Sequence, residues 1–69
     1  MKLKINGKTK DFNLDKLSIS GLLQVEKVME PEMVTVQRNG VFAERKDFET
    51  TLLSDGDEID FLYFMGGGG

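Results

Sequence analysis

The segment from Ile59 to Phe64 constrains the fold more than any other part of the chain, because it is apolar on both faces. Alternate side chains of an extended strand point to opposite sides. Here Ile59, Phe61 and Tyr63 fall on one side, and Asp60, Leu62 and Phe64 on the other. A strand of this kind is typical of the centre of a sheet. The preceding Asp55-Gly56-Asp57 is typical of a turn.

Two Asn-Gly dipeptides, Asn6-Gly7 and Asn39-Gly40, indicate two tight hairpins. This pair of residues supplies the positive φ angles of a type I′ turn. The first hairpin is expected to join residues 2–5 to 8–12, and the second to join 33–37 to 41–43. The expected core residues of these strands are Leu3, Ile5, Phe12, Leu14, Val34 and Val36.

Between the hairpins, apolar residues from Leu17 to Glu30 recur at helical spacing and predict one helix of about ten residues. Ser18 or Ser20 is the expected N-cap. Pro31 is expected to end the helix, because the residue before a proline avoids the α region. The expected apolar face comprises Leu22, Leu23, Val25, Val28 and Met29. A short helical turn is expected over 47–53, with Phe48, Leu52 and Leu53 as candidates for packing onto the sheet.

This order of elements predicts an α+β protein with a β-grasp (ubiquitin-like) fold, a mixed sheet of four to five strands packed on one helix. The first and last strands would lie side by side in parallel at its centre. One helix covers only one face of a sheet, so we expect Leu62 and Phe64 to be partly exposed on the other, as a docking surface. The alternative is that both pack under residues 47–53.

The domain is expected over residues 1–64, followed by a flexible glycine tail over 65–69. Glycine loses much backbone entropy on ordering and has no side chain to pack. Four extended residues reach about 13 Å, which would carry the carboxylate of Gly69 clear of the domain and into a narrow cleft of another protein. The alternative is an idle linker or a cloning remnant.

Composition limits the chemistry of the chain on its own. Its 69 residues permit one domain and include no cysteine and no histidine, so it lacks a thiol nucleophile, thiolate metal ligands and the commonest general base. A net charge of −3 argues against nucleic-acid binding. No apolar run approaches a membrane span and the N-terminus does not resemble a signal peptide, so we expect a cytoplasmic protein without membrane contact.

Four carboxylates gather near the last turn, and they are Asp55, Asp57, Glu58 and Asp60. Without histidine or an apolar pocket, such a group is more simply a solvated turn than a metal or general-acid site. It could also meet a basic patch on a partner and steer the encounter. We therefore assign no catalytic residue and no metal ligand.

Several stretches closely resemble the ThiS family, the ubiquitin-like sulfur carrier proteins of thiamine (thiazole) biosynthesis. They are Asn39-Gly40, Arg45, residues 51–59 (TLLSDGDEI) and residues 62–69 (LYFMGGGG). The resemblance spans the whole chain in element order, although its specific residues begin at Asn39. The chain departs from the family at Glu44, where a proline is common, and at Lys46, where a serine is common.

The resemblance implies a protein co-substrate rather than an enzyme, monomeric when alone. A partner that resembles ubiquitin-activating enzyme would consume ATP to adenylylate the carboxylate of Gly69, and no cofactor would be bound to the chain itself. Sulfur from a cysteine desulfurase would convert the adenylate to a thiocarboxylate, which thiazole synthase would use.

The same resemblance implies roles for the residues around the tail. Gly69 carries the sulfur, Gly68 permits close approach of a partner, and Gly66 and Gly67 provide reach. The residues expected to make apolar contacts with partners are Leu62, Phe64 and Met65, whereas Tyr63 is expected to lie in the core or at its rim.

Other functions fit the same pattern. A carrier for molybdopterin synthesis or for tRNA thiolation would use the same thiocarboxylate. A ubiquitin-like modifier would instead join its terminus to lysines, and a plain interaction module would have no use for the tail.

Overall fold

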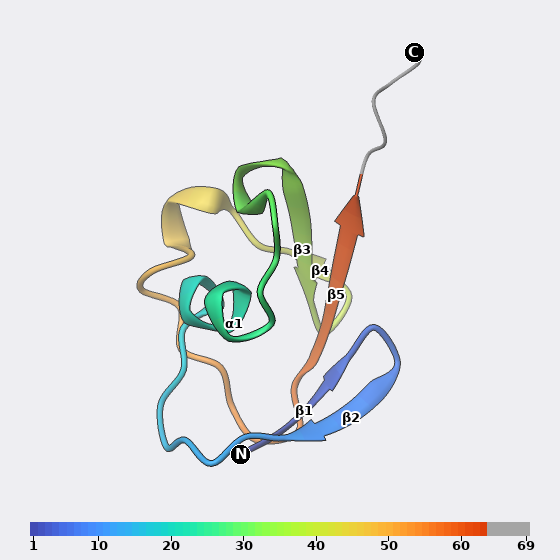
Figure 1. Ribbon diagram of the computed structural model, residues 1–69, viewed down its shortest axis with the longest axis vertical. Helices are drawn as coiled ribbons and strands as arrows, with labels where there is room; N and C mark the ends of the chain where they lie inside the picture. The colour runs from blue at the N-terminus through green and yellow to red at the C-terminus, as the bar shows by residue number, and fades with distance from the viewer. Residues whose placement is uncertain (64–69) are drawn as a thin grey trace.

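The computed structural model describes residues 1–63, which form a mixed five-stranded sheet packed on one short helix (Figure 1). The helix is α1 (Ile19–Val25), and the strands are β1 (Lys2–Ile5), β2 (Lys8–Asp11), β3 (Val34–Arg38), β4 (Val41–Phe42) and β5 (Glu58–Tyr63). Two short 3-10 helices, η1 (Pro31–Met33) and η2 (Arg45–Asp47), lie in the connections. The expected β-grasp fold is confirmed. No helix within residues 1–63 is long and apolar enough to cross a membrane.

The strand order is β2-β1-β5-β3-β4, so β5 occupies the centre of the sheet, as its sequence predicts. It runs parallel to β1 and antiparallel to β3. The parallel pairing includes hydrogen bonds of 2.9 Å from Lys4 N–H to the carbonyl of Asp57 and from Asn6 N–H to the carbonyl of Ile59. The first and last strands of the described chain are therefore neighbours.

Both Asn-Gly dipeptides form the expected hairpin turns. The φ angles are 50° and 85° at Asn6 and Gly7, and 53° and 83° at Asn39 and Gly40. These positive values match a type I′ turn. Asn6 has a second role, because its Oδ1 accepts a hydrogen bond of 2.8 Å from the backbone N–H of Phe61. Its side chain thereby links the first turn to β5 beyond the end of β1.

The core lies between the sheet and α1 and includes all but one of the predicted strand residues. Its buried apolar residues are Leu3, Ile5, Phe12, Leu17, Ile19, Leu22, Leu23, Val34, Val36, Phe48, Leu53, Ile59 and Phe61. The prediction for Leu14 is wrong, because its side chain is 42% exposed. Strand β2 ends at Asp11, and beyond the strand the alternation that would bury Leu14 no longer applies.

Every N-terminal N–H group of α1 has an acceptor. Ser18 is the N-cap, and its Oγ accepts from Gly21 N–H at 2.9 Å. Ile19 and Ser20 donate to the carbonyls of Thr51 and Phe48 at 3.2 and 2.8 Å. Gly21 is suited to this tight corner, because a Cβ there would lie 3.0 Å from Leu17 Cδ1 and 3.3 Å from Ser18 Oγ.

The predicted C-terminal part of the helix is wrong. Helix α1 ends at Val25, well before Pro31, because Lys27 adopts a left-handed φ of 54°. Val28 N–H donates to the carbonyl of Leu23 at 3.0 Å, and Lys27 N–H to that of Gln24 at 3.1 Å. These two bonds form a Schellman motif, which ends a helix without proline.

This early end changes which apolar residues are buried. Val28 packs partly against the core, as the Schellman motif favours. Val25 and Met29 are 46% and 93% exposed, so their assignment to the apolar helix face is wrong. Met29 lies beyond Glu26, where the chain no longer follows the helical period on which the assignment depends. Val25 is the last residue of α1, and its side chain lies outside the buried face formed by Ile19, Leu22 and Leu23.

The helical turn expected over 47–53 lies slightly earlier, at η2. Phe48 and Leu53 are buried as predicted, but Leu52 is 52% exposed. Leu52 pairs with Ser18 in an isolated antiparallel bridge. The backbone there is extended, so successive side chains point to opposite sides and only Leu53 faces the core.

Arg45 connects η2 to the start of β3. Its Nη1 donates to the carbonyl of Pro31 and its Nη2 to the carbonyl of Val34, both at 2.9 Å. The guanidinium also lies over the ring of Phe48, 5.2 Å from its centroid. Arg45 therefore satisfies two backbone acceptors, one in η1 and one at the first residue of β3.

Candidate functional site

The predicted site lies at the C-terminal end of β5, which residues 64–69 follow in sequence. Of the predicted site residues, only Leu62 belongs to the described part of the chain. Phe64, Met65 and the glycines Gly66, Gly67, Gly68 and Gly69 lie outside the described residues. The described geometry therefore concerns the strand that precedes the tail and the surface beside it.

Leu62 lies on the sheet face opposite α1. It pairs with Thr35 of the neighbouring strand β3, and its side chain is 36% exposed. The preceding residue, Phe61, faces the helix and is only 8% exposed. The expectation that Leu62 is partly exposed is confirmed, and the alternative that it packs under residues 47–53 is wrong. Its contact with a partner stays a prediction.

Phe42 extends the same sheet face and was not found from the sequence. It pairs with Gln37, which in turn pairs with Asp60, so these three side chains share the face of Leu62. Phe42 is 62% exposed. The available signal was the register of the second hairpin, because a two-residue Asn-Gly turn fixes which residues of its strands are opposite each other.

Tyr63 ends the described part of β5 on the other face. It pairs with Val34, which is fully buried, but its own side chain is 52% exposed. Tyr63 therefore lies at the rim of the core, one of the two places expected for it.

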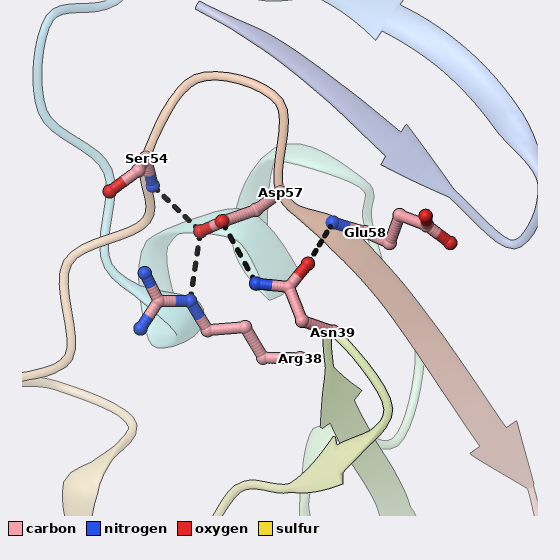
Figure 2. Close-up of polar contacts among 5 residues, drawn as sticks. All are labelled: Arg38, Asn39, Ser54, Asp57 and Glu58. Atoms are coloured by element: carbon pink, nitrogen blue, oxygen red, sulfur yellow. Dashed lines mark hydrogen bonds and ion pairs between the residues drawn. The ribbon is translucent and has the colours of Figure 1, made fainter.

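The start of β5 is held by a buried carboxylate, that of Asp57 (Figure 2). Its Oδ2 accepts from Arg38 Nε and from the backbone N–H of Ser54, both at 2.8 Å. Its Oδ1 accepts from Asn39 Nδ2 at 3.1 Å, and Asn39 Oδ1 accepts from Glu58 N–H at 2.9 Å. These contacts join the second hairpin turn to the turn before β5 (Figure 2).

The environment of Asp57 favours its charged form. Burial by itself raises the pKa of this carboxyl group, but hydrogen bonds from Ser54, Asn39 and Arg38, together with the positive charge of Arg38, outweigh burial and lower the pKa below its ordinary value of 3.8. Asp57 is therefore a structural anion. The prediction of a wholly solvated acidic turn is wrong at this position, because two of its three donors, Arg38 and Asn39, come from a hairpin distant in sequence.

Among residues 1–63, no group of three or more acidic, histidine or cysteine side chains is placed to hold a metal ion. Asp55 also has a structural contact, since its Oδ1 accepts from Lys2 N–H at 2.6 Å. The described part of the chain thus positions β5 and its exposed face. The reactive chemistry predicted for the protein belongs to the tail.

Comparison with known proteins identifies relatives over the full fold. The model of the ThiS family matches residues 3–68. A crystal structure of a thiamine biosynthesis protein (ThiS) from Geobacter metallireducens is 45% identical, with a TM-score of 0.90, and the match covers 99% of this chain and 100% of that one.

A solution NMR structure of a thiamine biosynthesis protein from the same organism is 44% identical, with a TM-score of 0.82. That match covers 100% of this chain and 90% of the other. A comparison with curated protein sequences gave no significant match. The family match and the structural similarity agree on one assignment, and the chain belongs to the ThiS family.

Proposed function

We propose that this protein is a sulfur carrier of thiamine biosynthesis and that the carboxylate of Gly69 accepts the sulfur. The observation that carries the proposal is the family match, which extends through Gly66, Gly67 and Gly68 rather than ending with the folded domain. The names of the two similar structures favour thiamine biosynthesis over the related molybdopterin and tRNA pathways.

The proposed chemistry begins with activation, because a carboxylate is a poor acyl donor. A partner that resembles ubiquitin-activating enzyme joins the Gly69 carboxylate to the α-phosphate of ATP and releases pyrophosphate. Sulfur from a persulfide made by a cysteine desulfurase then displaces AMP and gives an acyl disulfide. A second thiol attacks its S–S bond, so the thiocarboxylate is released and the two thiol sulfurs are joined as a disulfide. Thiazole synthase takes this sulfur in the cytoplasm.

In this scheme the protein is a co-substrate and its partners are the enzymes. The sequence contains no cysteine, so no side-chain persulfide can form on it, and the carried sulfur must be bonded to the chain end. Leu62, with Phe64 and Met65, is proposed to contact the partners next to the reacting terminus. Exposure of Leu62 at the end of β5 supports this role.

Intact-mass spectrometry tests the proposal. The protein is incubated with ATP, its activating enzyme, a cysteine desulfurase and cysteine. We expect a mass increase equal to the difference between sulfur and oxygen, located by fragmentation at Gly69. Omission of ATP and deletion of Gly69 are the controls, and each should abolish the increase. An unchanged mass with a competent cognate activating enzyme would refute the proposal.

A further inference from the structure

The two edges of the sheet differ in how they are protected. Edge strand β2 carries Lys8 and Lys10, and lysines on an edge strand discourage pairing with another chain. Edge strand β4 contains only Val41 and Phe42, which are 68% and 62% exposed. The second edge therefore presents apolar side chains without a charge within the strand.

The backbone of Phe42 is directed toward this open edge. Ala43 N–H donates to the carbonyl of Val36 at 2.9 Å, and the next opposed pair along the hairpin is Gln37 with Phe42. In an antiparallel ladder, hydrogen-bonded pairs alternate with pairs whose N–H and C=O groups point outward. Phe42 belongs to the second kind, so its N–H and C=O are available to another strand.

A groove of about 420 Å³ adjoins the edge. One wall includes Val41 and Ala43, and residues 44–51 contribute Glu44, Asp47 and Thr51. Arg38 also lines it, but its Nε is already paired with Asp57 at 2.8 Å. The other charged groups of the lining are the carboxylates of Glu44 and Asp47. Glu44 also forms an ion pair of 3.3 Å with Lys46, but both side chains of that pair are exposed, and such a surface pair contributes little. The two carboxylates therefore favour a cationic occupant.

We propose that the β4 edge and this groove bind an extended, basic segment of a partner protein by strand addition. The residue opposite Phe42 would exchange two backbone hydrogen bonds with it and place its side chain beside that of Phe42. The residues before and after would point to the other sheet face, where Val41 and the groove lie. Lysine or arginine at these two positions would meet Glu44 and Asp47. This inference does not depend on the proposed sulfur chemistry.

The probe is the synthetic peptide acetyl-Thr-Lys-Val-Lys-Thr-amide, titrated into ¹⁵N-labelled full-length protein and followed by NMR. We expect the largest shifts at Val41, Phe42 and Ala43, with a Kd on the order of 1 mM. A peptide with glutamates in place of the lysines, and one N-methylated at the central valine, should each bind at least several-fold more weakly.

The variant Asp47→Asn should weaken binding of the lysine peptide about two- to fivefold. The matched control Asp15→Asn makes the same charge change at an exposed position outside the groove and should leave the Kd unchanged. Equal affinity for the lysine and glutamate peptides would overturn the proposal, as would shifts confined to β2. Concentration-dependent shifts at β4 without peptide would assign this edge to a second copy of the chain and also overturn it.

Discussion

Asp57 is the one charged side chain that the fold buries within residues 1–63. Its two carboxylate oxygens accept three hydrogen bonds, from Arg38, Asn39 and Ser54. A buried anion is tolerated when its hydrogen bonds and charge are satisfied, and removal of one partner is costly. The position is therefore more sensitive to substitution than the acids around it, although all of them lie in one short acidic stretch.

We expect Asp57→Asn to lower the free energy of unfolding at pH 7 by about 1–3 kcal/mol, because an amide cannot accept from all three donors. Urea denaturation measures the change, and Asp15→Asn at an exposed site is the control. The folded-state pKa of Asp57 lies below its ordinary value of 3.8, so its contribution is complete above pH 3.8 and is lost as the pH falls further. The difference between wild type and variant should shrink in that range; a difference that grows there would contradict this role.

Lys27 stores backbone strain at the end of α1. Its φ of 54° is a conformation in which a Cβ crowds the following carbonyl oxygen, and glycine has no such conflict. We expect Lys27→Gly to raise the free energy of unfolding by roughly 0.5–1 kcal/mol. Lys27→Ala, which removes the charge but retains Cβ, should show no comparable gain in the same denaturation assay. A loss of stability in the glycine variant would refute this interpretation.

At the scale of the elements, the sequence predicts strands better than helices. Each hairpin is defined by a local Asn-Gly pair and by period-two alternation, so its strands are found within a residue or two. The end of α1 depends on the left-handed backbone conformation of Lys27. Neither glycine nor asparagine, the residues typical of this conformation, is present there to predict it. The exposure of Leu52 depends on its bridge to Ser18, a pairing between segments far apart in the chain.

Arg45 acts at the same scale, because it couples η2 to η1 and β3. Its guanidinium group donates to two carbonyls at once through Nη1 and Nη2, whereas the ammonium of a lysine acts as a single point charge. We expect Arg45→Lys to lower the free energy of unfolding by about 1 kcal/mol, and hydrogen exchange to quicken at η1 and η2 more than at β1 and β2. Lys46→Ala, at an exposed ion pair with Glu44, is the control. Uniform exchange changes across the sheet would contradict this local coupling.

For the whole molecule, the central position of β5 follows from its own apolar pattern, and so does the exposed face of Leu62. The turn Asn39-Gly40 places Phe42 opposite Gln37, but the sequence does not reveal that both share the face of Leu62, since this also requires the register between β3 and β5. The sequence also does not predict the structural role of Asp57. Its donors Arg38 and Asn39 are remote in sequence and contact it only in the folded protein. Local sequence patterns thus predict β5, whereas the residues that surround it are determined by pairing between segments far apart in the sequence.

Removal of the last two glycines should abolish the proposed sulfur loading without changing the stability of the fold. Within residues 1–63, the buried core extends from Leu3 to Phe61. We expect deletion of residues 68–69 to change the free energy of unfolding by less than about 0.5 kcal/mol, because terminal glycines have no side chain to pack. Sulfur loading by the activating enzyme should be abolished. Denaturation and intact-mass spectrometry on the same sample check both. Loss of stability on truncation would show that the tail contributes to the fold.

Strand β5 fills the middle of the sheet, yet the ribosome makes it after every other strand described here. Until it emerges, β1 and β3 have no neighbour between them, and the two hairpins cannot share one sheet. Because most long-range pairing depends on this strand, we expect folding to wait until the ribosome has made β5. Nascent chains that stop early would therefore remain open to proteolysis, and partner enzymes would meet only carriers whose synthesis has passed β5.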